Sequence, residues 1–167
     1  MRIRVAVVGV AIAALACTTL TTSVDYDRSL DFSHYRSFAF QKGTPARSEL
    51  AQKRIEEVIG AALQAKGLTP AGGRSPDLNV VTHVVVEKQQ RIETVVWGYG
   101  CRWGGGVATT AVTEIPVGTL IIDLVDAERA CLVWRGRATD TIGPDSEARE
   151  RQLQKAVARM LEGFPPK

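Results

Sequence analysis

The sequence predicts an α+β domain in which an antiparallel sheet of four to five strands carries two helices on one face. Two observations predict it. Several segments have the alternating or continuous apolar residues of strands and are separated by turn residues. Two other segments have apolar residues at helical spacing, and helices packed on one side of an antiparallel sheet bury both sets of apolar faces. The 167 residues are enough for one domain with a sizeable core.

The centre of the predicted sheet is a hairpin in residues 118–139. Two apolar segments rich in β-branched residues, 119–125 and 132–138, flank a short polar connection. Because side chains alternate along a strand, the following residues are expected to share the buried face: Leu120, Ile122, Leu124, Leu132, Trp134 and Ala138.

The same alternation places the charged residues of this hairpin. Asp123 and Asp126 are three residues apart and therefore belong to opposite faces, so they do not form a catalytic carboxylate pair. Arg135 and Arg137 share one face, on which they are expected to pair with Asp123 across the hairpin.

The other strands are predicted from similar patterns. They lie at residues 24–27, 35–40 and 78–87, and the last is expected to continue through 94–97. Residues 98–106, GYGCRWGGG, then form the tip of a long hairpin that returns through residues 107–116.

Two amphipathic helices complete the domain. The first is predicted to begin after Thr44 or Ser48 and to end at Lys66, where Gly67 provides a left-handed cap. Its apolar stripe is Leu50, Ile55, Val58, Ile59, Ala62 and Leu63. The second helix is predicted from residues 143–145 to about Glu162. Its buried stripe is Leu153, Val157, Met160, Leu161 and Phe164.

Residues 1–16 predict a secretory signal peptide, because a basic head precedes an apolar run. As a helix, the run would span roughly 18 Å, which is too short for a hydrocarbon core of about 30 Å. Its end, Ala14-Leu15-Ala16-Cys17, resembles a bacterial lipobox, which implies lipid attachment to Cys17. Ala14-Leu15-Ala16 also fits ordinary cleavage and release of a soluble protein. The predicted organisation is a signal peptide at 1–16, a lipidated tether at 17–23 and one domain at 24–167.

The predicted anchor also predicts where in the cell the protein is located. A diacylglycerol and an N-acyl chain such as palmitate would hold Cys17 stably in a membrane, since two or more chains suffice. Thr18, rather than an acidic residue, follows the cysteine. By analogy with lipoprotein sorting, this favours the outer membrane of the bacterial cell envelope, with the domain facing the periplasm.

Composition excludes several classes of function. The formal net charge is +3, and without Arg2 and Arg4, which belong to the signal peptide, 19 basic residues face 18 acidic ones. No basic cluster indicates a nucleic-acid surface. The three cysteines and two histidines are far apart, so no metal site is expected, and no motif indicates a cofactor.

Several motifs resemble one known family. They are DYD from Asp25, DFSHYRSFAF at 31–40, GTLIIDLVDA at 118–127, LVWRG at 132–136 and FPP at 164–166. The chain is similar in these motifs to the bacterial envelope lipoprotein family catalogued as domain of unknown function forty-one thirty-six. The resemblance implies an envelope lipoprotein with an α+β domain and no established activity. It supplies no catalytic residues.

The glycine and aromatic loop is the candidate interaction site. Trp97, Tyr99, Arg102 and Trp103 are expected to contact an envelope protein, a glycan or the membrane interface, with aromatic rings for stacking and a guanidinium for an anion. The alternative is a hairpin tip whose rings fold back on the sheet, with glycines that serve the turn.

No catalytic constellation is recognisable. Neither His34 nor His83 has a serine or cysteine arrangement that identifies a nucleophile. A disulfide between Cys101 and Cys131 is disfavoured, because a strand of about ten residues separates the two hairpin ends by roughly 30 Å. Two free thiols or an intermolecular Cys101 bond remain open.

The sequence therefore predicts a non-enzymatic, lipid-anchored envelope protein that binds another envelope component. Its alternatives are a periplasmic hydrolase with a site assembled from loops, and a carrier of an apolar ligand between sheet and helices. The oligomeric state is left open.

Overall fold

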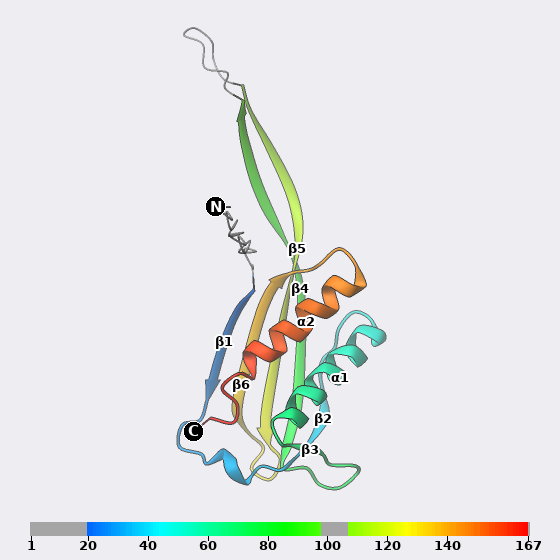
Figure 1. Cartoon of the computed structure of the whole chain (residues 1–167), viewed down its shortest axis with the longest axis vertical. Coiled ribbons are helices and arrows are strands. Elements are labelled where there is room, and N and C mark those ends of the chain that lie inside the picture. The colour runs from blue at the N-terminus through cyan, green and yellow to red at the C-terminus, as the bar shows by residue number, and fades with distance from the viewer. Residues whose placement is uncertain (1–19, 98–106, 167) are drawn as a thin grey trace, which may run out of the picture.

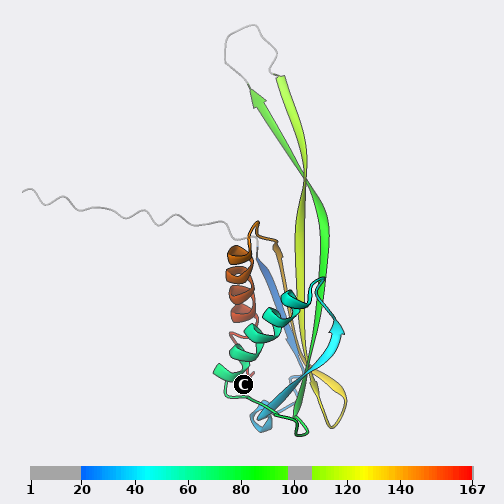
Figure 2. The ribbon, with the colours of Figure 1, turned by 90° about the vertical axis from the view of Figure 1, so that its right-hand side faces the viewer.

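The computed structural model describes residues 20–97 and 107–166, which form one layer of sheet and one layer of helices (Figure 1). The elements in these residues are, in order, β1 (Thr21–Tyr26), η1 (Phe32–His34, a 3-10 helix), β2 (Ser37–Thr44), α1 (Glu49–Ala65), β3 (Thr69–Pro70), β4 (Leu78–Trp97), β5 (Val107–Asp126), β6 (Cys131–Thr141) and α2 (Ser146–Met160). Both helices cover the same face of the sheet, as predicted (Figure 2).

The sheet differs from the predicted one in size and in strand direction. Its six strands lie in the order β1-β6-β5-β4-β2-β3. The four strands from β1 to β4 in this order are antiparallel, but β2 is parallel to both β3 and β4. The prediction of a purely antiparallel sheet of four to five strands is therefore wrong. The cause is α1, which carries the chain from the end of β2 back to the end where β2 began, so that β4 runs in the same direction.

The helix boundaries follow local capping chemistry. α1 begins after Ser48, the second of the two predicted N-caps, and Gly67 follows the helix with a φ of 94°, the left-handed conformation expected there. α2 is shorter than predicted and begins after Asp145, whose carboxylate accepts a hydrogen bond of 2.7 Å from the Ala148 N–H.

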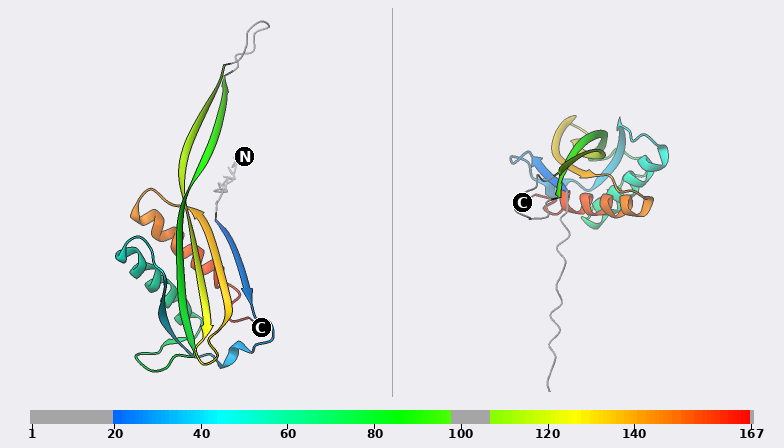
Figure 3. Two further views of the ribbon diagram at one scale, coloured as in Figure 1. Left: turned by 180° about the vertical axis from the view of Figure 1, so that it is seen from behind. Right: turned by 90° about the horizontal axis from the view of Figure 1, so that it is seen from above.

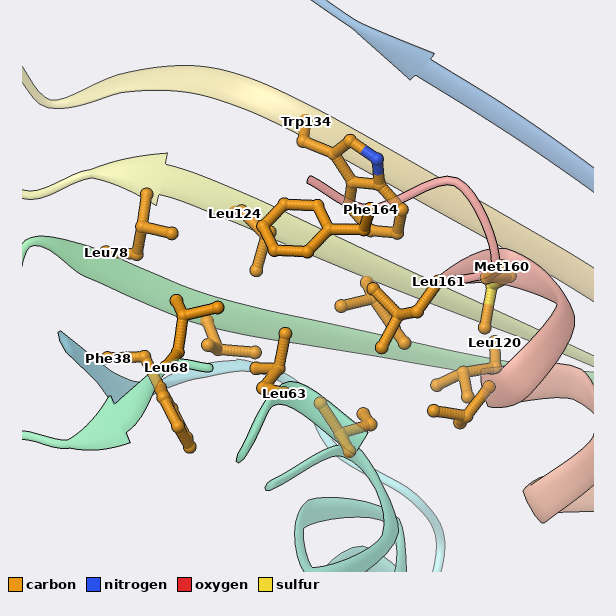
Figure 4. Packing of buried hydrophobic residues seen from close by; sticks show 14 of the residues in the cluster. Phe38, Leu63, Leu68, Leu78, Leu120, Leu124, Trp134, Met160, Leu161 and Phe164 are labelled. Carbon is orange, nitrogen blue, oxygen red and sulfur yellow. The ribbon is translucent and has the colours of Figure 1, made fainter. Parts of the chain in front are cut away.

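The core lies between the two helices and the sheet (Figure 4). Its fully buried side chains are Trp134, Ile59, Leu63, Leu78, Ile122, Leu124, Met160, Leu161, Val80, Val133 and Val157. Phe164, which follows α2, packs edge-on against the Trp134 ring at a centroid distance of 5.8 Å. The chain after α2 thus closes the core over the central hairpin.

Two residues predicted for the core are exposed. Leu50 is 70% exposed because it precedes Ile55 by five residues, which places it about 140° around α1 from the buried stripe. Leu132 is 45% exposed because the pairing of β5 with β6 shifts register between Leu124 and Val125. This bulge gives β6 one extra residue, Val133, which is buried instead.

The first strand begins earlier than predicted. β1 starts at Thr21 rather than at residue 24, and Leu20 is already buried. The chain therefore enters the domain at the end of the sheet from which β4 and β5 project (Figure 1).

Candidate functional site

The feature that distinguishes this molecule is a two-stranded arm that projects from the body (Figures 1 and 3). β4 and β5 pair along their entire lengths of 20 residues, from Leu78 with Asp126 to Trp97 with Val107. Their neighbours end much earlier, because the last β6 pair is Val117 with Thr141. In the part of the chain that the structure describes, residues 88–97 and 107–116 therefore form a ribbon that pairs with no further strand. We call these residues the arm, and ten paired residues make it about 30 Å long.

Local sequence explains where the arm begins. Pro116 is the arm residue of β5 that is nearest to the body. Proline has no N–H to donate and is tolerated at the edge of a sheet. The Pro116 carbonyl oxygen accepts a hydrogen bond of 2.8 Å from the Ile142 N–H, which fixes the base of the arm to the end of β6. An ion pair of 2.8 Å between Lys88 and Glu114 lies just above, on exposed side chains where it contributes little stability.

Further along the arm, apolar side chains are exposed to solvent. Ile92 and Val112 lie directly opposite each other in the pairing and are 66% and 57% exposed. In the sequence from there to the end of the paired strands, residues 93–97 and 107–111, Glu93 is the one charged residue. Among the described residues, no further strand pairs with the outer half of the arm, which exposes an apolar pair, and such a surface is suited to a partner.

Of the predicted interaction residues, the structure describes one, which is at the end of this arm. Trp97 is the last residue of β4 and pairs with Val107. Tyr99, Arg102 and Trp103 lie outside the described residues, as does Cys17. The predicted extents of the two flanking strands, through residue 97 and from residue 107, are confirmed, and the binding role of the segment between them stays a prediction.

A polar cluster lies on the sheet face opposite the helices. Arg135 donates two hydrogen bonds, of 2.7 and 2.6 Å, to the buried carboxylate of Asp123, as predicted from the alternation. These bonds raise the pKa of the Arg135 guanidinium. His83 Nε2 lies 3.7 Å from Asp123, and its Nδ1 accepts a hydrogen bond of 3.3 Å from the Thr44 N–H. Since both carboxylate oxygens bind Arg135, the cluster cross-links β2, β4, β5 and β6 as a structural network.

The other singled-out residues are separate from one another. His34 is exposed at the end of η1 and its ring packs against Tyr35, at a centroid distance of 4.1 Å. Cys131 is an exposed free thiol at the start of β6, and Cys101 lies outside the described residues. In the part of the chain that the structure describes, no group of three histidine, cysteine or acidic side chains is arranged to hold a metal ion.

An apolar groove of about 310 Å³ lies between the first turns of the two helices and the sheet. The sequence analysis names an apolar ligand between sheet and helices as an alternative but does not identify the residues that line this groove, because they come from six separate segments of the chain. One of its walls is Leu20, the first described residue, so the groove is at the end of the body where the chain enters and where the arm projects. Across the described ranges, no helix has the length and apolar character needed to cross a membrane.

The fold and these features define a two-layer α+β domain with a projecting two-stranded arm. The chain belongs to the family described as Domain of unknown function (DUF4136), which matches residues 22–166. This is the family that the sequence motifs indicate. Among curated proteins, none matches the chain.

Solved structures share the fold at low sequence identity. A PDZ domain protein from Parabacteroides distasonis is 20% identical with a TM-score of 0.57, and the match covers 90% of this chain but 36% of that protein. PelC from Paraburkholderia phytofirmans, described as a dodecamer, is 15% identical with a TM-score of 0.57, covering 89% of this chain and 99% of PelC. A dodecamer of a singly substituted form of PelC is 16% identical with a TM-score of 0.54, covering 85% and 94%. At these identities the likeness shows the fold alone.

Proposed function

We propose that this chain is a lipid-anchored protein of the bacterial outer membrane, facing the periplasm, that holds another envelope component with its arm. The proposal assigns no reaction to the chain. The observation that carries it is the free length of the arm, about 30 Å of paired strand that contributes nothing to the core of the body.

An isolated two-stranded ribbon is marginally stable in water, because it has neither a third strand nor a buried apolar face. The arm nevertheless keeps a regular register through all ten of its pairs. A partner that covers Ile92 and Val112, and that pairs with one of the free edges, would supply the missing burial and hydrogen bonds. A structural arm of this kind therefore gains most of its stability from the component it binds.

The point at which the chain enters the sheet is consistent with a partner at the membrane. One row of paired residues crosses the sheet just before the arm begins: Thr21 on β1, Thr139 on β6, Thr119 on β5 and Val85 on β4. The start of β1 is therefore level with the base of the arm. Thr21 is four positions after Cys17, so the length of chain between them would keep a lipid on Cys17 within about 14 Å of the start of β1. An anchor there would be at the same end of the body as the arm, and the arm would reach components at the membrane surface.

Assembly of many copies is compatible with this fold. The PelC proteins, which share it, form dodecamers. In such an assembly the partner of an arm would be another copy of the chain or a component held by several copies together. Photo-crosslinking from the arm distinguishes these two partners by the mass of the adduct.

The experiment places a photo-crosslinking amino acid at Val112 in otherwise intact cells. We expect an adduct that is lost when Ile92→Glu is added, because the charge opposes burial of the opposite side chain. Leu50→Glu is the matched control, since Leu50 is an equally exposed apolar residue on α1, and it should leave the adduct unchanged. Equal adducts from the arm and from a probe at Leu50 would refute a binding role for the arm.

The anchor is tested separately by Cys17→Ser and cell fractionation. The variant should move from the membrane fraction to the soluble periplasmic fraction, since the acyl chains supply the membrane affinity. Continued retention in the membrane would contradict the anchor without touching the role of the arm.

A further inference from the structure

We infer that the apolar groove beside the base of the arm binds a single-chain anionic amphiphile, a fatty acid whose alkyl chain lies between the helices and the sheet. This inference concerns a groove on the body of the domain, and no residue of the arm lines it. Its test therefore reads out this groove and not the role of the arm.

The lining of the groove suits an alkyl chain. Its floor and walls are apolar side chains from the residue before β1, from α1, from the three central strands and from α2, among them Leu20, Ile55, Val84, Leu120, Leu153 and Ala156. The volume of about 310 Å³ is at the small end of ligand sites, which matches one alkyl chain rather than the two tails of a phospholipid. Elsewhere the same helix-to-sheet interface is filled by fully buried side chains, such as Ile59 and Leu63.

The charges around the groove select an anionic head group. Three arginines line it: Arg47 before α1, Arg54 on α1 and Arg149 on α2. Among the described residues, none of the three forms an ion pair. Two acids also line the groove, Asp140 and Glu150, so the lining keeps a net positive charge.

The acids are engaged in other hydrogen bonds. Asp140 accepts a hydrogen bond of 2.8 Å from the Thr141 N–H, and Glu150 accepts one of 3.5 Å from Gln154. Guanidinium groups bind carboxylates with paired hydrogen bonds, so the arginines provide the complementary contact for a fatty acid carboxylate. All three arginines are exposed, so a neutral alkyl chain would leave them hydrated and would gain no contact from them.

The test is a calorimetric titration of the full chain carrying Cys17→Ser, so that no detergent competes, with octanoate, decanoate and dodecanoate. Burial of each methylene contributes about 0.8 kcal/mol, which predicts roughly fourfold tighter binding per carbon and about fifteenfold per step of the series. Dodecanol, which has the chain without the charge, should bind at least tenfold more weakly than dodecanoate. Affinity that does not depend on chain length would overturn the inference.

Two pairs of variants locate the site. Ala51→Phe places a ring in the groove and should weaken dodecanoate binding at least tenfold, whereas Ala61→Phe, on an exposed position of α1 away from the groove, should not. If circular dichroism shows that Ala51→Phe does not fold, the charge variants test the location of the site instead. Arg149→Gln should remove most of the preference for dodecanoate over dodecanol, and Arg159→Gln, an exposed arginine of the same helix, should keep it.

Sedimentation of the same samples tests whether a second copy of the chain, rather than a fatty acid, occupies the groove. A stable dimer that Ala51→Phe disperses would mean that a second copy covers the groove, and would overturn the inference. A monomer that binds dodecanoate with the expected chain-length dependence would support it.

Discussion

The hydrogen bond between Tyr35 and Asp126 gives the sharpest test of how this fold is stabilised. Both side chains are buried, 6% and 5% exposed, and the Tyr35 hydroxyl donates to Asp126 Oδ2 at 2.8 Å. The other carboxylate oxygen accepts the N–H groups of Glu128 and Arg129 at 2.9 and 2.8 Å. Tyr35 precedes β2 and Asp126 ends β5, so the bond ties two elements that are 91 residues apart.

Replacing Tyr35 by Phe removes this one donor while keeping the ring in the core. A hydrogen bond to a charged group contributes about 1.5–3 kcal/mol, and the carboxylate oxygen left behind is buried. We therefore expect Tyr35→Phe to lower the free energy of unfolding by about 2 kcal/mol at pH 7.

The effect should depend on pH in a defined direction. The Arg129 N–H and, next, the Tyr35 hydroxyl hold the pKa of Asp126 below its usual value against the opposing effect of burial. A carboxyl with a lowered folded pKa contributes stability above its unfolded pKa of about 3.9, and this contribution is lost as the pH falls through the folded pKa. Tyr35→Phe raises the pKa of Asp126 in the folded state towards its unfolded value. The loss of stability that this substitution causes should therefore shrink as the pH falls below about 4.

Urea denaturation of both proteins between pH 7 and pH 3 measures this difference. The control is Tyr26→Phe, because Tyr26 is a half-buried tyrosine whose hydroxyl has no hydrogen-bond partner among the described residues, and it should cost less than about 0.5 kcal/mol. An effect of Tyr35→Phe that is as small as the control at pH 7, or equally large at pH 3 and pH 7, would refute the reasoning.

Two further substitutions test packing and the open sheet face. Gly136→Ala should destabilise the protein by about 1–3 kcal/mol in urea denaturation, because the new Cβ would lie 2.5 Å from Cη2 of the buried Trp134 ring, which must then move. Arg135→Gln should cost about 1–2 kcal/mol, because the carboxylate of Asp123 is buried and loses two charge-assisted hydrogen bonds. Each has a matched control. Gly163→Ala adds its Cβ where nothing lies within 4 Å, so it should leave stability nearly unchanged. Arg137→Gln changes the neighbouring exposed arginine on the same sheet face and should have little effect. A cost for either control as large as for its partner would mean that these contacts are not the cause.

The periodicity of the sequence determined the elements and their faces. Alternation in residues 119–125 placed Asp123 opposite the helices and predicted its pairing with Arg135, and the glycine-rich segment after Trp97 marked the end of the hairpin. These features depend on neighbours in one strand or across one turn, and such neighbours are set by local backbone geometry.

Tertiary structure alone decided three things. The parallel pairing of β2 with β4 depends on where α1 returns the chain, which no periodicity records. The arm is free because β6 ends at Thr141 and β2 at Thr44, so its freedom is a property of its neighbours rather than of its own sequence. The apolar groove needs six segments brought together by packing, and a sequence pattern describes each of them only by itself.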